Sequence, residues 1–259
     1  MWMIYRVKFG TPERGWVILV HGLGEHSGRY GKLIRMLIEA GFAVYTFDWP
    51  GHGRSSGKRG HTSVEEAMEI IDGIIDEIRE KPFLFGHSLG GLTVIRYAET
   101  RPDNIQGVIA SSPALAKSPK TPSFFVILAK ILGRISPKIT LSNGIDPKLL
   151  SRNPEAVERY VKDPLVHDKI SAKLGKSIFE NMELAHIEAE RIKVPILLLV
   201  GTNDVITPPE GARRLFEELK VKDKTLKEFE GAYHEIFEDP EWGEEVHKVI
   251  IEWIKRHAG

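Results

Sequence analysis

The sequence predicts an α/β protein with a mostly parallel, doubly wound sheet flanked by helices and interrupted by a helical insertion. The first observation is that short apolar runs alternate with segments of helical periodicity over most of the chain, as in repeated strand–helix units. The second is that residues 17–20 and 196–200 are continuously apolar rather than alternating. Such runs are typical of strands that helices cover on both faces, which favours a parallel sheet.

The composition fits one large domain and excludes several classes of function. Of the 259 residues, 42% are hydrophobic, which is enough to fill a sizeable core. Lys plus Arg and Asp plus Glu both number 36, so no overall basic charge favours binding to nucleic acid or to an anionic membrane. The chain has no cysteine, which excludes disulfides, zinc–thiolate sites and a cysteine nucleophile.

The apolar runs are too short to cross a membrane. The longest are residues 124–129 and 195–200, far below the roughly 20 residues that a spanning helix needs. Residues 1–10 carry Arg6 and Lys8 within an apolar stretch and lack the three-part pattern of a signal peptide. We therefore expect a cytoplasmic protein.

The expected strands each end in glycine or turn residues, and helical segments follow the early ones. Strands are expected at residues 16–20, 43–47, 83–85, 108–110, 196–200 and 225–229. Residues 30–40 carry an apolar face of helical spacing and end at Gly41. Residues 63–80 have a similar face and begin with Ser63 and Glu66, the pattern of a capping box.

The strand–helix alternation stops after residue 113 and resumes near residue 196. Residues 114–190 contain no convincing strand, but they hold an apolar segment at 124–132 and a polar helical run from about 171 to 191. We interpret this as a helical cap, residues 114–190, inserted over the carboxyl edge of a core made of residues 1–113 and 191–259.

The strongest motif is Gly86-His87-Ser88-Leu89-Gly90, which directly follows an apolar strand and precedes a helical segment. This G-x-S-x-G pattern in that context is typical of a nucleophile elbow. Its glycines permit a turn so sharp that side chains at 86 and 90 would collide with neighbouring backbone. We predict that Ser88 is a nucleophile at the start of a helix, where amide groups favour negative charge.

A serine nucleophile needs a histidine to take its proton and a carboxylate to orient that histidine. After Ser88 in the chain the histidines are His167, His186, His234, His247 and His257. His234 is favoured because it follows the expected last strand, and Asp204 is favoured because it follows the buried strand at 196–200. Asp223 and Asp239 are rivals for the acid, although neither directly follows a strand.

The loop after the first strong strand, Val20-His21-Gly22-Leu23-Gly24, is the expected oxyanion hole. Its glycines let the backbone approach a ligand, so the amides of Leu23 and Leu89 can bind the developing negative charge. We expect His21 to brace this loop rather than to catalyse. The loop at residues 48–55 is also interpreted as structural, because Asp48 precedes the nucleophile.

Several motifs together resemble one family. The run from His21 to Tyr30, HGLGEHSGRY, is similar to the oxyanion loop of monoacylglycerol lipases. Further similar segments are residues 48–55, 86–90, 139–153, 163–165 and 231–234. The resemblance covers nearly the whole chain and indicates the monoacylglycerol lipase and lysophospholipase group of the α/β-hydrolase fold. One departure is Phe237, where some relatives carry a second histidine.

The resemblance implies Ser88, Asp204 and His234 as a catalytic triad, with Leu23 and Leu89 as oxyanion amides. It also implies that the cap forms an acyl tunnel without metal or other cofactor. Substrate contacts are implied at Glu25, Arg29 and Tyr160, with a salt-bridged loop brace as an equal alternative for the first two.

The expected function is hydrolysis of monoacylglycerols, a single-chain acyl lipid substrate, through an acyl-enzyme. Alternatives on the same triad are a lysophospholipase, a broad carboxylesterase or a peptidase, and a remote one is a non-catalytic binding protein. The apolar cap segment, which includes Phe124 and Phe125, could also rest transiently on a membrane surface. Chain-length preference and oligomeric state do not follow from the sequence.

Overall fold

The computed structural model describes residues 3–119 and 121–258, with the side chains of residues 123 and 125 outside that description. Within these ranges a seven-stranded sheet has the order β1-β3-β2-β4-β5-β8-β9. Only β1 runs antiparallel to its neighbour. The strands are β1 (Arg6–Phe9), β2 (Trp16–Val20), β3 (Ala43–Phe47), β4 (Phe83–His87), β5 (Gly107–Ser111), β8 (Ile196–Gly201) and β9 (Lys224–Phe229). The predicted fold class is confirmed.

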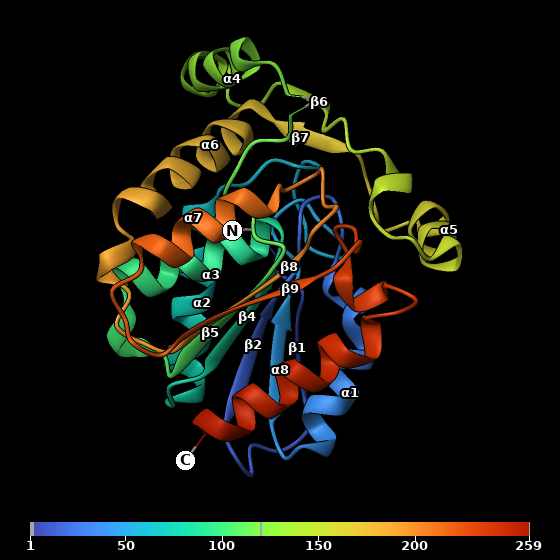
Figure 1. Cartoon of the computed structure of the whole chain (residues 1–259). Helices are drawn as coiled ribbons and strands as arrows, with labels where there is room; N and C mark the ends of the chain where they lie inside the picture. Colours follow the sequence, from blue (N-terminus) through green and yellow to red (C-terminus); the bar gives the residue numbers. More distant parts are fainter. Residues whose placement is uncertain (1–2, 120, 259) are drawn as a thin grey trace.

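Helices cover both faces of this sheet (Figure 1). Helices α1 (Gly31–Glu39) and α8 (Gly243–His257) pack on one face. Helices α2 (Val64–Ile78), α3 (Leu89–Thr100) and α7 (Pro209–Glu218) pack on the other. Every residue of β3, β4, β5 and β8 is buried, which explains their continuous apolar character. The N-cap at Ser63 is confirmed, because its hydroxyl accepts a hydrogen bond from the Glu66 amide.

Strand β1 was not among the expected strands. It lies at the sheet edge, alternates exposed and half-buried residues, and includes Arg6 and Lys8. An edge strand of this kind buries little, so charged side chains alternate with its apolar ones and no continuous apolar run marks it.

The segment between β5 and β8 lies mostly over the carboxyl ends of the strands (Figure 1). It contains α4 (Ser123–Ile135), β6 (Thr140–Ser142), α5 (Pro154–Lys162), β7 (Lys169–Ser171) and α6 (Ala172–Ile187). The expectation of no strand here is wrong, because β6 and β7 pair antiparallel. Three-residue strands have too little periodicity to be read from sequence, and only the fold brings their ends together. Short 3-10 helices complete the chain at Ser27–Tyr30, Pro102–Asn104, Pro147–Leu149, Ala189–Arg191 and Ile236–Glu238.

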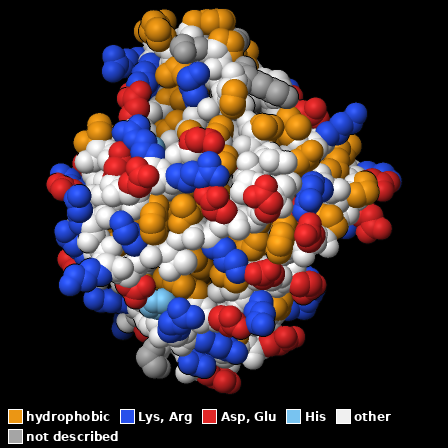
Figure 2. All heavy atoms as spheres, in the orientation of Figure 1, with side chains coloured by type: hydrophobic (Ala, Val, Ile, Leu, Met, Phe, Trp, Pro, Cys, Tyr) orange, Lys and Arg blue, Asp and Glu red, His pale blue; other side chains and the backbone are white. Residues whose placement is uncertain are grey.

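Helix α6 is part of the main core rather than a separate layer. Its Leu174 and Ala185 are fully buried in the same hydrophobic cluster as α2 and α3. Helix α4 lies on the outer side of α6 and carries five of the twelve exposed large apolar side chains among the described residues (Figures 1 and 2). Among the helices in the described ranges, none is long and apolar enough to cross a membrane.

Candidate active site

Ser88 occupies a strained turn between β4 and α3. Its backbone has φ 56° and ψ −115°, a region that residues with a side chain rarely adopt. A Cβ added at Gly86 would overlap the Gly90 carbonyl, and one added at Gly90 would overlap the Val20 carbonyl. The predicted need for both glycines is therefore confirmed. The turn is also held by the Ser88 amide, which donates to the Ser111 carbonyl at 2.9 Å.

His234 and Asp204 meet at the carboxyl ends of β9 and β8. Nδ1 of His234 donates to Asp204 Oδ2 at 2.7 Å, and both side chains are buried. This bond leaves His234 Nε2 as the proton acceptor. Burial alone would lower the pKa of His234, but the Asp204 carboxylate outweighs burial and raises it. Burial would likewise raise the pKa of Asp204, and the facing imidazole and hydrogen bonds lower it instead.

Two further residues hold this pair, and sequence reasoning missed both. The Thr207 hydroxyl lies 2.8 Å from Asp204 Oδ2 and 2.9 Å from the Ser112 carbonyl oxygen, while the Thr207 amide donates to Asp204 Oδ1. The Ser112 hydroxyl donates to the His234 carbonyl at 2.7 Å. The D-x-x-T spacing from Asp204 to Thr207 is a turn pattern that could have indicated the first contact. No local pattern indicates the second.

The residue before the nucleophile lies against the candidate base. The His87 ring packs on the His234 ring with centroids 4.7 Å apart, which places His234 beside the Ser88 turn. Burial lowers the pKa of His87 to about 3, with the His234 ring as the second cause. His87 is therefore neutral at physiological pH. Within the described ranges Ser88 Oγ and His234 Nε2 share no hydrogen bond, as is common before substrate binds.

The Leu23 and Leu89 amides flank the Ser88 turn. An added Cβ at Gly22 would lie 3.2 Å from Ser88 Cβ, so the loop before Leu23 passes directly beside the nucleophile. Leu89 is the first residue of α3, where amides have no acceptor within the helix. Neither amide donates to another described residue. Both amides are thus available to an oxyanion.

His21 and Asp48 have structural contacts, as expected. His21 Nε2 accepts from the Trp49 amide and its Nδ1 donates to the Gly22 carbonyl. Asp48 accepts hydrogen bonds from the amides of Ser27 and Arg54. These contacts fix the two loops to each other and leave neither side chain at the Ser88 turn.

The rival acids are used elsewhere. Asp223 pairs with His257 at 3.0 Å. Asp239 forms a two-point ion pair with Arg152. Among the described residues, no cluster of three or more histidines and carboxylates has the geometry to hold a metal ion.

Ser88 lies in a mostly apolar cavity of about 430 Å³, a size within the usual range for ligand sites. Leu23 and Leu89 also line it. Its remaining apolar wall comes largely from the segment between β5 and β8, with Leu128, Leu132, Ile139, Ile170, Ile178, Phe179 and Met182. Helices α4 and α6 therefore build the surroundings of the nucleophile.

The structure does not place Glu25, Arg29 or Tyr160 in the lining of that cavity. Glu25 and Arg29 are paired at 2.6 Å, and the Tyr160 ring lies 4.8 Å from the Arg29 guanidinium. Of the two interpretations of Glu25 and Arg29, the geometry favours the loop brace. Glu235, which no motif indicated, is the second carboxylate on Arg29.

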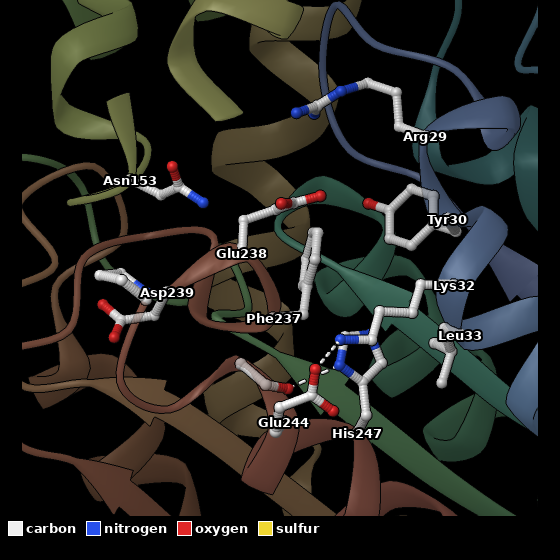
Figure 3. A pocket seen from close by; sticks show the side chains of 12 residues that line it. Arg29, Tyr30, Lys32, Leu33, Asn153, Phe237, Glu238, Asp239, Glu244 and His247 are labelled. Atoms are coloured by element: carbon white, nitrogen blue, oxygen red, sulfur yellow. Dashed lines mark hydrogen bonds and ion pairs between the residues drawn. The ribbon is translucent and has the colours of Figure 1, made fainter. Parts of the chain in front are cut away.

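A second, polar pocket of about 220 Å³ lies next to this site (Figure 3). Arg29, Lys32, Glu238 and His247 line it, but Ser88 does not. Phe237 forms part of its wall, and the same ring packs edge-on against His87 at 5.0 Å. Phe237 thus lies between His87 and the polar pocket.

Comparison with known proteins gives consistent matches. A family model described as Serine aminopeptidase, S33 matches residues 11–241. The chain is 35% identical to human monoglyceride lipase, over 96% of this chain and 84% of that protein. It is 33% identical to phospholipase YtpA of Bacillus subtilis, over 87% of this chain and 89% of that protein. A crystal structure of Paleococcus ferrophilus monoacylglycerol lipase is 79% identical with a TM-score of 0.98, covering 98% of this chain and 99% of that one.

A longer relative contains a similar region. An uncharacterized abhydrolase domain-containing protein of Dictyostelium discoideum is 36% identical over 92% of this chain. The chain spans only 26% of that protein's length.

Proposed function

The chain belongs to the serine hydrolase family that the Serine aminopeptidase, S33 model describes, and we propose that it hydrolyses the ester of monoacylglycerols. The observation that carries the proposal is a strained serine at the floor of an apolar cavity, next to a buried His–Asp pair. The relatives named as monoglyceride and monoacylglycerol lipases support the same substrate class.

The mechanism follows from the positions of five residues. Ser88 Oγ attacks the ester carbonyl while His234 Nε2 takes its proton, and the Leu23 and Leu89 amides bind the oxyanion. His234 then gives the proton to the leaving glycerol oxygen, which leaves an acyl-enzyme. Water then attacks the acyl-enzyme ester while His234 takes a proton from it, and the proton passes to Ser88 Oγ as the fatty acid is released. Asp204 holds the imidazole and stabilises its charged form.

The cavity supports a single acyl chain as the bound group. Its walls are mostly aliphatic, so each buried methylene contributes about 0.8 kcal/mol to binding without a charged partner. In this proposal residues 114–190 act as the cap over the core of residues 1–113 and 191–259.

The outer face of α4 supports contact with a lipid surface. Phe124, Ile127, Ile131 and Ile135 are each more than half exposed and follow one helical face. Figure 2 shows apolar side chains gathered over this end of the molecule. Phe125, which the sequence analysis included in the apolar cap segment, has a side chain that lies outside the described ones. An apolar helix face beside the substrate cavity can meet single-chain lipids where they reside.

A phospholipase activity is the second candidate. The match to phospholipase YtpA supports it, since both activities need the same triad and an acyl cavity. A lysophospholipid would place a charged phosphate where monoacylglycerol places a hydroxyl. The substrate panel below separates the two activities.

The test is the Ser88→Ala variant assayed on monoacylglycerols of rising chain length. We expect loss of activity to near background, because the nucleophile is gone. Wild-type protein should also react with a fluorophosphonate probe, which a non-catalytic relative would not do. Retained hydrolysis by Ser88→Ala would overturn the mechanism. Faster hydrolysis of lysophosphatidylcholine, or of a diacylglycerol, would overturn the substrate class.

A further inference from the structure

Three buried charged side chains form one continuous ion-pair system beside the candidate triad. Arg29 Nη1 lies 2.6 Å from both Glu25 Oε2 and Glu235 Oε1, and Nη2 lies 2.9 Å from Glu235 Oε2. Glu25 and Glu235 have side-chain exposures of 4% and 2%, and Arg29 of 10%. Such a planar fork, with two short contacts to one carboxylate, has a fixed geometry that a lysine cannot reproduce.

Each carboxylate holds a different catalytic loop. Glu25 Oε1 accepts from the Gly22 amide at 2.6 Å, immediately before the oxyanion residue Leu23. The same oxygen accepts from the Tyr30 hydroxyl at 2.6 Å. Glu235 directly follows His234, and its amide donates to a carbonyl of the segment between β5 and β8 at 2.7 Å. The Arg29 guanidinium is therefore the bridge between the oxyanion loop and the loop of the base.

A role in binding glycerol does not fit these contacts. Arg29 lines the polar pocket rather than the Ser88 cavity (Figure 3), and the Phe237 ring in the wall of that pocket packs against His87. Both glutamates already accept short hydrogen bonds from Arg29. The side chains that would have to contact the alcohol are thus committed to the protein.

We propose that Arg29 is a positioning residue that, through Glu25 and Glu235, fixes the oxyanion amide of Leu23 relative to His234. The proposal rests on the proposed function, since it concerns the same serine hydrolase site. A displacement of about 1 Å between catalytic groups can lower turnover about 10²-fold. Loss of the Arg29 contacts to Glu25 and Glu235 is therefore expected to lower kcat strongly.

The system also sets the charge next to the base. One guanidinium and two carboxylates leave a net negative charge beside His234. Both glutamates raise the pKa of His234, by less than Asp204 does. The carboxylates that act on the pKa of His234 are Asp204, Glu235 and Glu25, and the titratable ring packed against it is His87, whose own pKa Arg29 lowers. Removing a carboxylate and removing the guanidinium should therefore move this pKa in opposite directions.

The main experiment compares Arg29→Ala and Arg29→Lys on two substrates. p-Nitrophenyl butyrate has no glycerol, whereas a monoacylglycerol does. We expect Arg29→Ala to lower kcat about 10²-fold on both with little change in KM, and Arg29→Lys to lose less. Unchanged kcat on p-nitrophenyl butyrate with a raised KM for the monoacylglycerol would overturn the proposal in favour of a substrate contact.

The pH dependence of kcat/KM gives a readout that general loss of structure would not produce. The base must be neutral, so the rate falls on the acid side as His234 becomes protonated. Glu235→Gln should move this acid limb to lower pH, and Arg29→Ala should move it to higher pH. Shifts in the same direction for both variants would contradict the proposal. Because Glu235→Gln and Arg29→Lys keep most contacts, they test it even where Arg29→Ala fails to fold.

The matched control is Arg96→Ala, because Arg96 is also buried and shared by two glutamates but contacts no catalytic loop. We expect Arg96→Ala to leave kcat unchanged at temperatures where it is folded. An equal loss of kcat in Arg96→Ala would overturn the specific role of Arg29.

Fluorophosphonate labelling distinguishes failure of the proposed function from failure of this inference. Absence of labelling in the wild type would defeat the proposed function itself. A labelled wild type with an Arg29→Ala variant of unchanged kcat would defeat only this inference.

Discussion

Two largely buried arginines in this protein each pair with two glutamates but differ in their surroundings. Arg29 joins Glu25 and Glu235, which belong to two loops at the active site. Arg96 joins Glu99, within α3, and Glu188, at the end of α6. The first connects loops whose exact placement determines chemistry, and the second connects helices that already pack through the hydrophobic core. The same ion-pair chemistry therefore has consequences set by the elements it joins.

The two clusters also differ in how completely their polar atoms are paired. Burial would raise the pKa of Glu25, but the Arg29 guanidinium, two nearby histidines and the Tyr30 hydroxyl together outweigh burial, and the pKa falls to about 2. Burial raises the pKa of Glu99 to about 8 despite Arg96, and its Oε1 has no partner among the described residues. The cluster at the active site is thus held in its charged form, whereas the Arg96 cluster contains a carboxyl that titrates in the neutral range.

The largest expected effect on stability comes from Arg96→Met. Arg96 donates hydrogen bonds to the buried side chains of Glu99 and Asn181, and a buried polar group left without its partner typically costs about 1–3 kcal/mol. We expect a loss of this size in the free energy of unfolding, measured with denaturant at neutral pH, while kcat of the folded protein is retained. A stability change below about 1 kcal/mol would show that the buried contacts of Arg96 contribute little to folding.

The second effect is a change in the pH dependence of stability in Glu99→Gln. The pKa of Glu99 is raised from 4.5 to about 8, so between these values the folded protein holds a proton that the unfolded chain releases. Its contribution is complete below pH 4.5 and is lost as pH rises through 8. The slope of stability against pH over this interval should become less negative in Glu99→Gln, by up to about 1.4 kcal/mol per pH unit.

Denaturant titrations of wild type and Glu99→Gln at several pH values measure this slope difference. Activity profiles of the two proteins should coincide, since Glu99 does not contact the site. Parallel stability curves would contradict a neutral-range titration of Glu99.

The smallest effect concerns Tyr160, whose ring lies over the Arg29 guanidinium. A cation–π contact of about 0.5–1 kcal/mol depends on the ring and not on the hydroxyl. We expect Tyr160→Phe to match the wild type, and Tyr160→Leu to lower kcat about 2–5-fold. A raised KM for monoacylglycerol in Tyr160→Phe would instead indicate a hydroxyl contact with substrate.

Much of the fold was predictable because its signals are local. The buried strands β3, β4, β5 and β8 are apolar along their length, and Ser63 caps α2 within four residues. Strands β1, β6 and β7 were not predicted, since an edge strand and two three-residue strands bury too little to leave a pattern.

The sequence by itself determined the turn at Ser88 and the chain order of Ser88, Asp204 and His234. The turn depends on backbone sterics within a few residues, where only glycine fits at 86 and 90. The tertiary structure alone decided that Arg29 binds Glu235, because these residues are 206 positions apart and neither lies in a motif that names its partner. It also decided which apolar side chains surround Ser88, since a cavity is a property of packed elements rather than of any segment.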